Sequence, residues 1–124
     1  MSTGKMVGIG GILYGYAYRY SSETQLHKII AGILDDAHIQ YTHEYCLDSS
    51  NRVDFWLEDG MLIEVKVDGS YPEAMRQIDR YCALEAVTGV ILASTQRWAG
   101  RYDGEVQEIH GKPVMVVRLR RQVL

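Results

Sequence analysis

The sequence predicts an α/β domain built on a mixed β-sheet, with elements in the order α-β-β-β-α-β and a β-hairpin extension at the C-terminal end. Two segments have apolar residues at helical spacing, short apolar runs of strand length lie between and after them, and turn residues stand at the boundaries. The chain has 124 residues, 47% of them hydrophobic. This suits a single domain, residues 1–124, with its own core.

Residues 1–20 are rich in glycine and tyrosine, and three interpretations stay open for them: a flexible arm, an edge hairpin or an oligomer contact. The segment has no clean apolar stretch of the kind found in signal peptides, and no part of the chain approaches the ~20 apolar residues of a membrane span. We therefore expect a soluble, cytoplasmic protein. So short a chain has little room for a separate recognition domain, which favours a dimer or higher homo-oligomer.

The first predicted helix covers residues 21–37, where apolar residues recur every three to four positions. Ser22 and Gln25 have the spacing of a capping box at its start. Three predicted strands follow, at residues 39–47, 51–57 and 61–67.

A second helix is predicted within residues 68–86, again with a capping box, formed by Ser70 and Glu73. Residues 89–94 are a continuous apolar run after that helix, which is typical of a buried strand parallel to an earlier one. Two further strand-like segments, EVQEI and PVMVVRL, separated by HGK, predict a closing hairpin over residues 104–121.

The turn between the second and third strands decides which side chains share a face of the sheet. A three-residue loop of Glu58, Asp59 and Gly60, with Gly60 in the left-handed conformation, gives one wholly apolar face. The pairs on that face are Leu57–Met61, Phe55–Ile63 and Val53–Val65. The other face then carries the charged pairs Asp54–Glu64 and Arg52–Lys66.

Like charges that stand directly opposite each other destabilise a strand pair, so the Asp54–Glu64 pair needs an explanation. One alternative is a solvated sheet face in which diagonal contacts to Arg52 and Lys66 offset part of the repulsion. The other is a divalent cation between the two carboxylates, because carboxylate oxygens are the ligands that Mg²⁺ prefers.

Asp54, followed after nine residues by Glu64-Val65-Lys66, resembles the motif of the PD-(D/E)xK nuclease superfamily, which has the restriction-endonuclease-like fold. The resemblance covers about residues 22–95, where the predicted elements follow in the matching order. It implies that Asp54, Glu64 and the carbonyl of Val65 hold Mg²⁺ or Mn²⁺. It also implies that Lys66 positions the attacking water or stabilises charge in the transition state.

Two further positions match the family. Glu23 stands where the resemblance implies a first-helix glutamate that binds the metal or its water; an acid favoured by the helix dipole is the alternative. Gln77 and Tyr81 resemble the QxxxY motif of the exonuclease-like branches, whose residues orient the substrate phosphate and the catalytic lysine. A glutamine and a tyrosine at the edge of the core would show the same spacing.

The charge distribution favours a cation site beside segments that contact phosphates. All 16 acidic residues lie between Glu23 and Glu108; that span carries 7 − 16 = −9, and the two ends together carry +6. An ordinary solvated surface is the alternative. The arginines expected to contact the phosphate backbone are Arg76, Arg80, Arg118 and Arg120.

These patterns predict a Mg²⁺-dependent deoxyribonuclease, with endonuclease or exonuclease action left open. The alternative is a non-catalytic nucleic-acid-binding or assembly subunit with the same fold. The histidines at positions 27, 38, 43 and 110 share no spacing and are expected at the surface or with satisfied partners; His43, near the start of a strand, stays an outside candidate.

Overall fold

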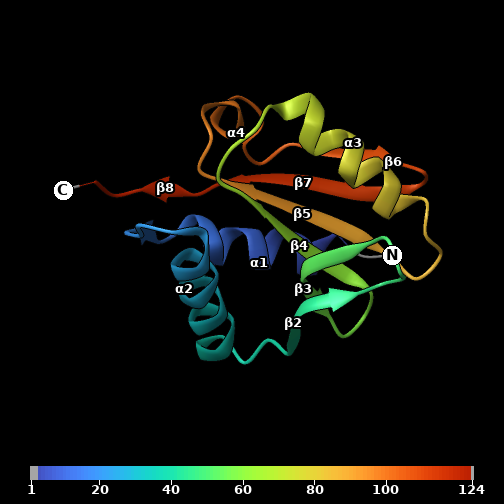
Figure 1. Cartoon of the computed structure of the whole chain (residues 1–124), viewed down its shortest axis with the longest axis horizontal. Helices are drawn as coiled ribbons and strands as arrows, with labels where there is room; N and C mark the ends of the chain where they lie inside the picture. The colour runs from blue at the N-terminus through green and yellow to red at the C-terminus, as the bar shows by residue number, and fades with distance from the viewer. Residues whose placement is uncertain (1–2, 124) are drawn as a thin grey trace.

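A six-stranded mixed sheet forms the centre of the computed structural model, which describes residues 3–123 (Figure 1). In spatial order its strands are β2 (Tyr41–Cys46), β3 (Arg52–Leu57), β4 (Met61–Lys66), β5 (Gly89–Ser94), β7 (Lys112–Arg118) and β6 (Val106–Ile109). Strands β4, β5 and β7 are parallel, and the remaining neighbours pair antiparallel. The α/β class and the mixed sheet are thus confirmed.

Helices cover both faces of the sheet (Figure 1). Helices α1 (Gly4–Tyr14) and α2 (Glu23–Asp36) pack on one face, and α3 (Tyr71–Cys82) and α4 (Arg97–Tyr102) on the other. Strands β4 and β5 are buried on both sides because each has neighbours in the sheet and helices above and below. Within residues 3–123, no helix is long and apolar enough to cross a membrane.

The expected order α-β-β-β-α-β is present as α2-β2-β3-β4-α3-β5. Strand β5 pairs parallel with β4, as its apolar run predicts. The C-terminal hairpin, β6 and β7, is not an appendage. Strand β7 pairs with β5 and extends the sheet, so the hairpin completes the core.

Helix α1 corrects the expectation of an arm or an edge hairpin in residues 1–20. Met6 and Leu13 of α1 are fully buried against the sheet, and Gly10 lets the helix approach Met115 of β7 closely. The sequence hides this helix because its apolar residues lie on all sides rather than on one stripe. Its outer side exposes Val7 and Ile12, in the segment for which an oligomer contact is one of the three open interpretations.

The short segment after α1 pairs with the C-terminal segment in a small parallel sheet, separate from the main sheet. Strand β1 (Ala17–Tyr18) pairs with β8 (Arg120–Arg121). The guanidinium of Arg121 lies over the ring of Tyr20, 4.2 Å from its centroid. This pairing brings Arg120 and Arg121 beside the segment that carries Arg19, whereas Lys5 and Lys112 lie near the other end of the sheet.

Candidate metal centre

The hairpin of β3 and β4 has the predicted register. Phe55 pairs with Ile63, and Gly60 in the loop has φ of 89°. Only glycine adopts such a conformation without strain, so Gly60 fixes the three-residue loop and, through it, the pairing of the two strands.

Beyond Phe55 the ordinary pairing of β3 with β4 stops, and carboxylates take over the hydrogen bonds. The N–H of Asp54 donates to Glu64 Oε1 at 3.2 Å. The N–H of Val65 donates to Asp54 Oδ2 at 2.8 Å. Because a buried backbone N–H needs an acceptor, these side chains satisfy the donors that the separating strands leave behind.

Strand β2 is irregular at the same level. Its pairing with β3 runs to His43–Phe55 and resumes at Tyr45–Val53, with Glu44 and Asp54 omitted between them. Glu44 has φ of 55°, which is uncommon for a residue with a side chain and marks local strain.

Strand β3 changes the facing of its side chains at Asp54. Phe55 packs in the core under α1 and α2, but Val53 packs in the core under α3. The expected single apolar face containing Val53 is therefore wrong, although the register is right. The cause is the distortion at Asp54 and Glu44, which the strand pattern does not show.

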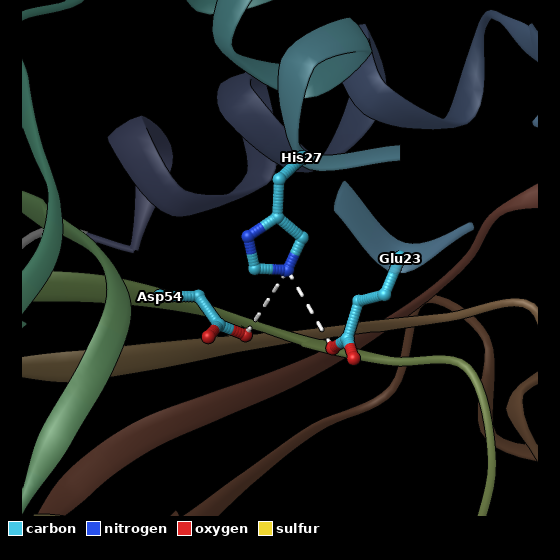
Figure 2. Close-up of side chains that lie close together, drawn as sticks. All are labelled: Glu23, His27 and Asp54. Atoms are coloured by element: carbon cyan, nitrogen blue, oxygen red, sulfur yellow. Dashed lines mark ion pairs between the residues drawn. The ribbon is translucent and has the colours of Figure 1, made fainter. Parts of the chain in front are cut away.

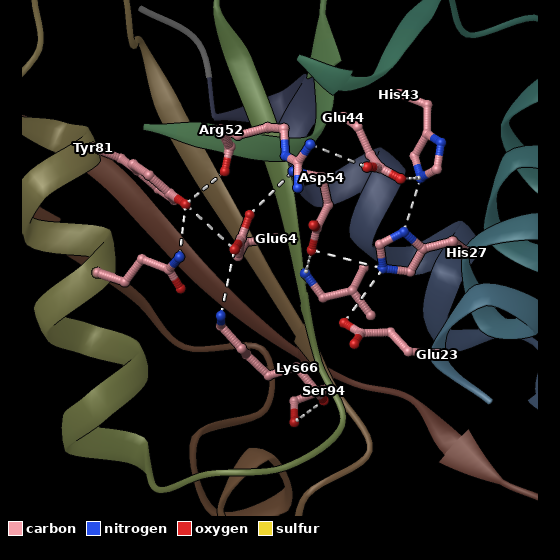
Figure 3. Close-up of polar contacts among 12 residues, drawn as sticks. Glu23, His27, His43, Glu44, Arg52, Asp54, Glu64, Lys66, Tyr81 and Ser94 are labelled. Carbon is pink, nitrogen blue, oxygen red and sulfur yellow. Dashed lines mark hydrogen bonds and ion pairs between the residues drawn. The ribbon is translucent and has the colours of Figure 1, made fainter. Parts of the chain in front are cut away.

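As a result, the two carboxylates have different surroundings (Figure 3). Glu64 and Lys66 lie on the α3 side of β4, with Lys66 Nζ 3.4 Å from Glu64 Oε2. Asp54 faces the histidine of α2. The alternative of a salt-bridged face places Arg52 diagonally to Glu64, but Arg52 pairs with Glu44 of β2, at 3.6 Å.

Glu64 is almost completely buried, with 3% of its surface exposed. Burial, followed by the negative charge of Asp54, raises the pKa of Glu64 to about 7, although Lys66 acts in the opposite direction. Burial also raises the pKa of Asp54, against the hydrogen bond from Val65. The two carboxylates therefore carry their full charge at neutral pH only at a free-energy cost, which a bound cation would offset.

Gln77 is connected to Glu64 through the hydroxyl of Tyr81. Gln77 Nε2 donates to the Tyr81 hydroxyl at 2.8 Å, and that hydroxyl lies 3.0 Å from the carbonyl of Arg52 and 3.4 Å from Glu64 Oε2. Burial raises the pKa of Tyr81, so the hydroxyl keeps its proton and donates. Tyr81 is 1% exposed, so it faces Glu64 rather than the solvent where a substrate phosphate was expected.

On the α2 side of the point where the pairing of β3 with β4 stops, the side chains of Asp54, Glu23 and His27 converge (Figure 2). His27 Nε2 lies 3.6 Å from Glu23 Oε2 and 3.8 Å from Asp54 Oδ2, and one ligand atom from each of the three residues lies within 4.8 Å of the others. Ser22 caps α2 by accepting from the N–H of Gln25, which places Glu23 in the first turn and His27 directly above it. Gln25 itself binds Ser21 rather than completing the predicted box.

The Nε2 atom of His27 is buried and has no hydrogen-bond partner within residues 3–123. The other ring nitrogen, Nδ1, lies 2.8 Å from His43 Nε2. Two ligand atoms that are each about 2.1 Å from one ion are roughly 3.0 Å apart when adjacent and about 4.2 Å apart when opposite. The two spacings from His27 fall within this range, and all three donor atoms lie within 4.8 Å of one another, so these residues are candidate ligands of one divalent ion.

The cluster opens to solvent. A hollow of about 440 Å³ is lined by Glu23, His27, His43 and Asp54, together with Thr24, Lys28, Glu44 and Arg52. A phosphate group and water can therefore reach the three candidate ligands from outside.

The other predicted residues lie at varying distances from this centre. Val65 contacts Asp54 through its N–H; no contact of its carbonyl at the centre is seen within residues 3–123. Arg76 and Arg80 are exposed on α3. Arg118 is the last residue of β7 and is in register with Ser94 of β5, which is itself in register with Lys66 of β4. Arg120 lies in β8, with its guanidinium 5.4 Å from the ring centroid of Tyr14.

His27 is the residue that the sequence analysis missed. A search for spacing among histidines does not find it, because two of its partners are acids and the third, His43, lies on a separate strand. Its position four residues after Glu23 on one helix face is the available signal, since such residues are neighbours on a helix. His43, kept as an outside candidate, contacts His27 directly.

Comparison of the chain with protein-family models, with curated proteins and with solved structures finds no match. Its function therefore has to be argued from the site itself.

Proposed function

We propose that this protein is a metal-dependent nuclease that hydrolyses phosphodiester bonds of DNA. The observation that carries the proposal is the convergence of Glu23, His27 and Asp54 at the place where β3 and β4 separate. Glu64 and Lys66 stand on the other side of the same separation. Five side chains of the types used in metal-assisted hydrolysis thus meet at one end of strands β3 and β4.

Glu23, His27 and Asp54 would hold the ion, and the buried, unpartnered Nε2 of His27 is the best evidence that this donor set fits one. A bound divalent cation supplies Lewis acidity to a phosphoryl oxygen and lowers the pKa of a coordinated water. In the hydrolysis a water oxygen bonds to phosphorus, the bond from phosphorus to the leaving ester oxygen breaks, and that oxygen gains a proton.

Lys66 has the role of stabilising negative charge on the phosphoryl group in the transition state. Its side chain is 25% exposed and lines a neighbouring hollow, and the ammonium group lies 3.4 Å from Glu64. A positive charge held near a developing negative charge lowers the barrier without reorganisation during the reaction.

Glu64, Tyr81 and Gln77 keep Lys66 in place. The Tyr81 hydroxyl shares its one proton between the Arg52 carbonyl and one carboxylate oxygen of Glu64. The N–H of Asp54 donates to the other oxygen, and Gln77 orients the Tyr81 hydroxyl. The QxxxY pair is therefore assigned to positioning rather than to direct contact with the substrate.

The basic surface at the same end of the sheet supports a nucleic acid as substrate. Ser94 lies in register between Lys66 and Arg118, and Tyr20 donates to Thr95. Tyr20 also lines a hollow of about 580 Å³, together with Arg19, Arg121, Ser21, Gln25, Gln122 and Val123. Arginines beside the reactive groups suit the phosphate backbone. The choice of DNA rests on the resemblance of the Asp54, Glu64 and Lys66 motif.

The proposal is tested by incubating the protein with linear, circular, single-stranded and branched DNA in Mg²⁺, Mn²⁺ or EDTA. We expect cleavage of at least one substrate with metal and none with EDTA. Asp54→Asn should abolish cleavage. Glu108→Gln, which changes an exposed acid on β6 at the far edge of the sheet, should leave it unchanged. Binding without cleavage in every condition would favour the non-catalytic alternative.

A further inference from the structure

The ring orientation of His27 bears on which metal the proposed centre takes. An imidazole with Nδ1 2.8 Å from His43 Nε2 can donate its Nδ1 proton to that nitrogen. In this tautomer Nε2 carries a free lone pair, directed between Glu23 and Asp54. A metal-binding histidine usually donates its other N–H in this way, and the partner fixes both tautomer and orientation.

A charged histidine bound between two carboxylates is the competing arrangement, and the geometry disfavours it. The distances from Nε2, 3.6 Å to Glu23 and 3.8 Å to Asp54, exceed the range of about 2.7–3.2 Å for N–H···O hydrogen bonds. Charged partners would be expected closer than neutral ones. Both distances instead lie within the range of about 3.0–4.2 Å between two ligand atoms of one ion.

The surroundings hold His27 and His43 in this arrangement. The ring of Phe55 packs against both imidazoles, with centroid distances of 5.5 Å to His27 and 4.9 Å to His43. His43 comes from β2, next to the strained Glu44, and so belongs to a different element from His27. With its side chain only 10% exposed, His27 has little freedom to turn Nε2 away from the carboxylates.

We infer that the centre of Glu23, His27 and Asp54 selects a transition-series divalent cation, of which Mn²⁺ is the probe, over Mg²⁺, and that His43 positions His27 for this selection. The inference deepens the proposed function and rests on its metal centre. Mg²⁺ prefers oxygen ligands and keeps much of its water, whereas transition-series ions accept imidazole nitrogen, Mn²⁺ the least strongly among them. One imidazole added to two carboxylates therefore raises the affinity for Mn²⁺ more than that for Mg²⁺.

The test is metal binding without DNA, by calorimetric titration of the metal-free full chain with Mn²⁺ alone and with Mg²⁺ alone. We expect wild type to bind Mn²⁺ at least ~10-fold more tightly than Mg²⁺. His27→Gln should lower Mn²⁺ affinity by ~10-fold or more and change Mg²⁺ affinity far less, because glutamine still offers an oxygen ligand. His110→Gln, at an exposed histidine that pairs with Asp79, is the matched control and should preserve both affinities.

His43 is tested with two variants. His43→Leu removes the acceptor for His27 Nδ1 and should weaken Mn²⁺ binding by ~10- to 100-fold. His43→Gln retains an acceptor oxygen and should recover much of that loss, a rescue that a purely structural role would not produce. If His27→Gln does not fold, the His43 pair still tests the inference.

Equal affinities for Mn²⁺ and Mg²⁺ in wild type, or unchanged selectivity in His27→Gln and His43→Leu, would overturn the inference. Cleavage of DNA by a protein without Mn²⁺ selectivity would reject the inference and leave the proposed function standing. Selective Mn²⁺ binding by a protein that cleaves no DNA would do the opposite.

Discussion

The backbone N–H of Asp54 donates to a side-chain oxygen of Glu64 at 3.2 Å, at the point where the backbone pairing of their strands has ended. The negative charges of the proposed site are therefore also part of what joins β3 to β4. Substituting either acid changes charge and strand pairing together, so amide replacements, which keep an acceptor oxygen, are the informative variants.

Glu64→Gln should stabilise the metal-free protein at alkaline pH. The pKa of Glu64 is raised from 4.5 to about 7 in the folded state. The protonated Glu64 carboxyl contributes to the free energy of unfolding fully below pH 4.5, and this contribution is lost as pH rises through about 7. The free energy of unfolding of wild type should therefore fall over this window. Glutamine removes the titration and should gain on the order of 3 kcal/mol at pH 8, with little difference at pH 4.5. Urea unfolding in EDTA at both pH values measures this.

The matched control for that experiment is Glu108→Gln, an exposed acid on β6. It should show the pH dependence of wild type. A Glu64→Gln protein that loses stability between pH 4.5 and 8 as steeply as wild type would show that Glu64 is not the titrating group.

Mg²⁺ or Mn²⁺ should raise the melting temperature of wild type, because a ligand bound only by the folded state stabilises it. At a metal concentration 100 times Kd the gain is about 2.7 kcal/mol. Asp54→Asn retains an acceptor for the N–H of Val65 but removes a charged ligand, and should erase most of the shift. Equal shifts in the two proteins would place the metal elsewhere.

Lys66→Met should lower turnover by ~10²-fold or more while leaving metal affinity within a few-fold of wild type, because Lys66 acts on the substrate and contacts Glu64 rather than the three candidate ligands. Single-turnover cleavage and calorimetric metal titration separate the two effects. An unchanged cleavage rate would remove Lys66 from the proposed mechanism.

Gln77→Ala should lower turnover more than DNA affinity, because Gln77 acts through Tyr81 and Glu64 on the reacting groups. Tyr81→Phe removes the same hydroxyl link and should produce a similar loss. The double variant should be little worse than either single one, since both changes break one chain of hydrogen bonds. Additive losses would show that Gln77 acts independently of Tyr81.

Replacing Arg118 and Arg120 together by alanine should weaken DNA binding across sequences and flatten its salt dependence by about two units of slope. Affinity measured at several salt concentrations in Ca²⁺ gives both quantities. The matched control replaces Lys5 and Lys112 together by alanine. These changes remove the same amount of positive charge near the opposite end of the sheet, where Lys5 pairs with Asp59 and Lys112 begins β7. If the two double variants behave alike, the effect is one of net charge and not of a binding surface.

The sequence predicted those parts of the fold whose cause is local. The register of β3 with β4 follows from the apolar pattern and from Gly60, and the second helix begins at the predicted box of Ser70 and Glu73. Helix α1 escaped prediction because its apolar residues show no stripe and its stability depends on a sheet formed by distant residues.

The sequence allowed several residues of the candidate site to be predicted, but not how these residues are arranged around it. Glu23 and Asp54 lie together as expected for metal ligands, but Glu64 does not join them, because the side chains of β3 change their facing at Asp54, beside the irregular Glu44 of the neighbouring strand. That contact is tertiary, so no pattern within β3 reveals it. For the same reason, Glu64 lies with Tyr81 while Asp54 lies with His27.

The pairing of β1 with β8 joins Ala17 to Arg120, which makes it one of the longest-range contacts in the fold. Closing a loop of about 100 residues costs roughly 4 kcal/mol of chain entropy, so this pair should form late, after the central sheet has brought its partners close. The arginines of the two ends therefore come together only in a nearly complete molecule. A folding intermediate with the sheet but without this closure would have the acidic centre and lack the concentrated positive surface, so the capacity to hold a polyanion should appear as one of the last events of folding.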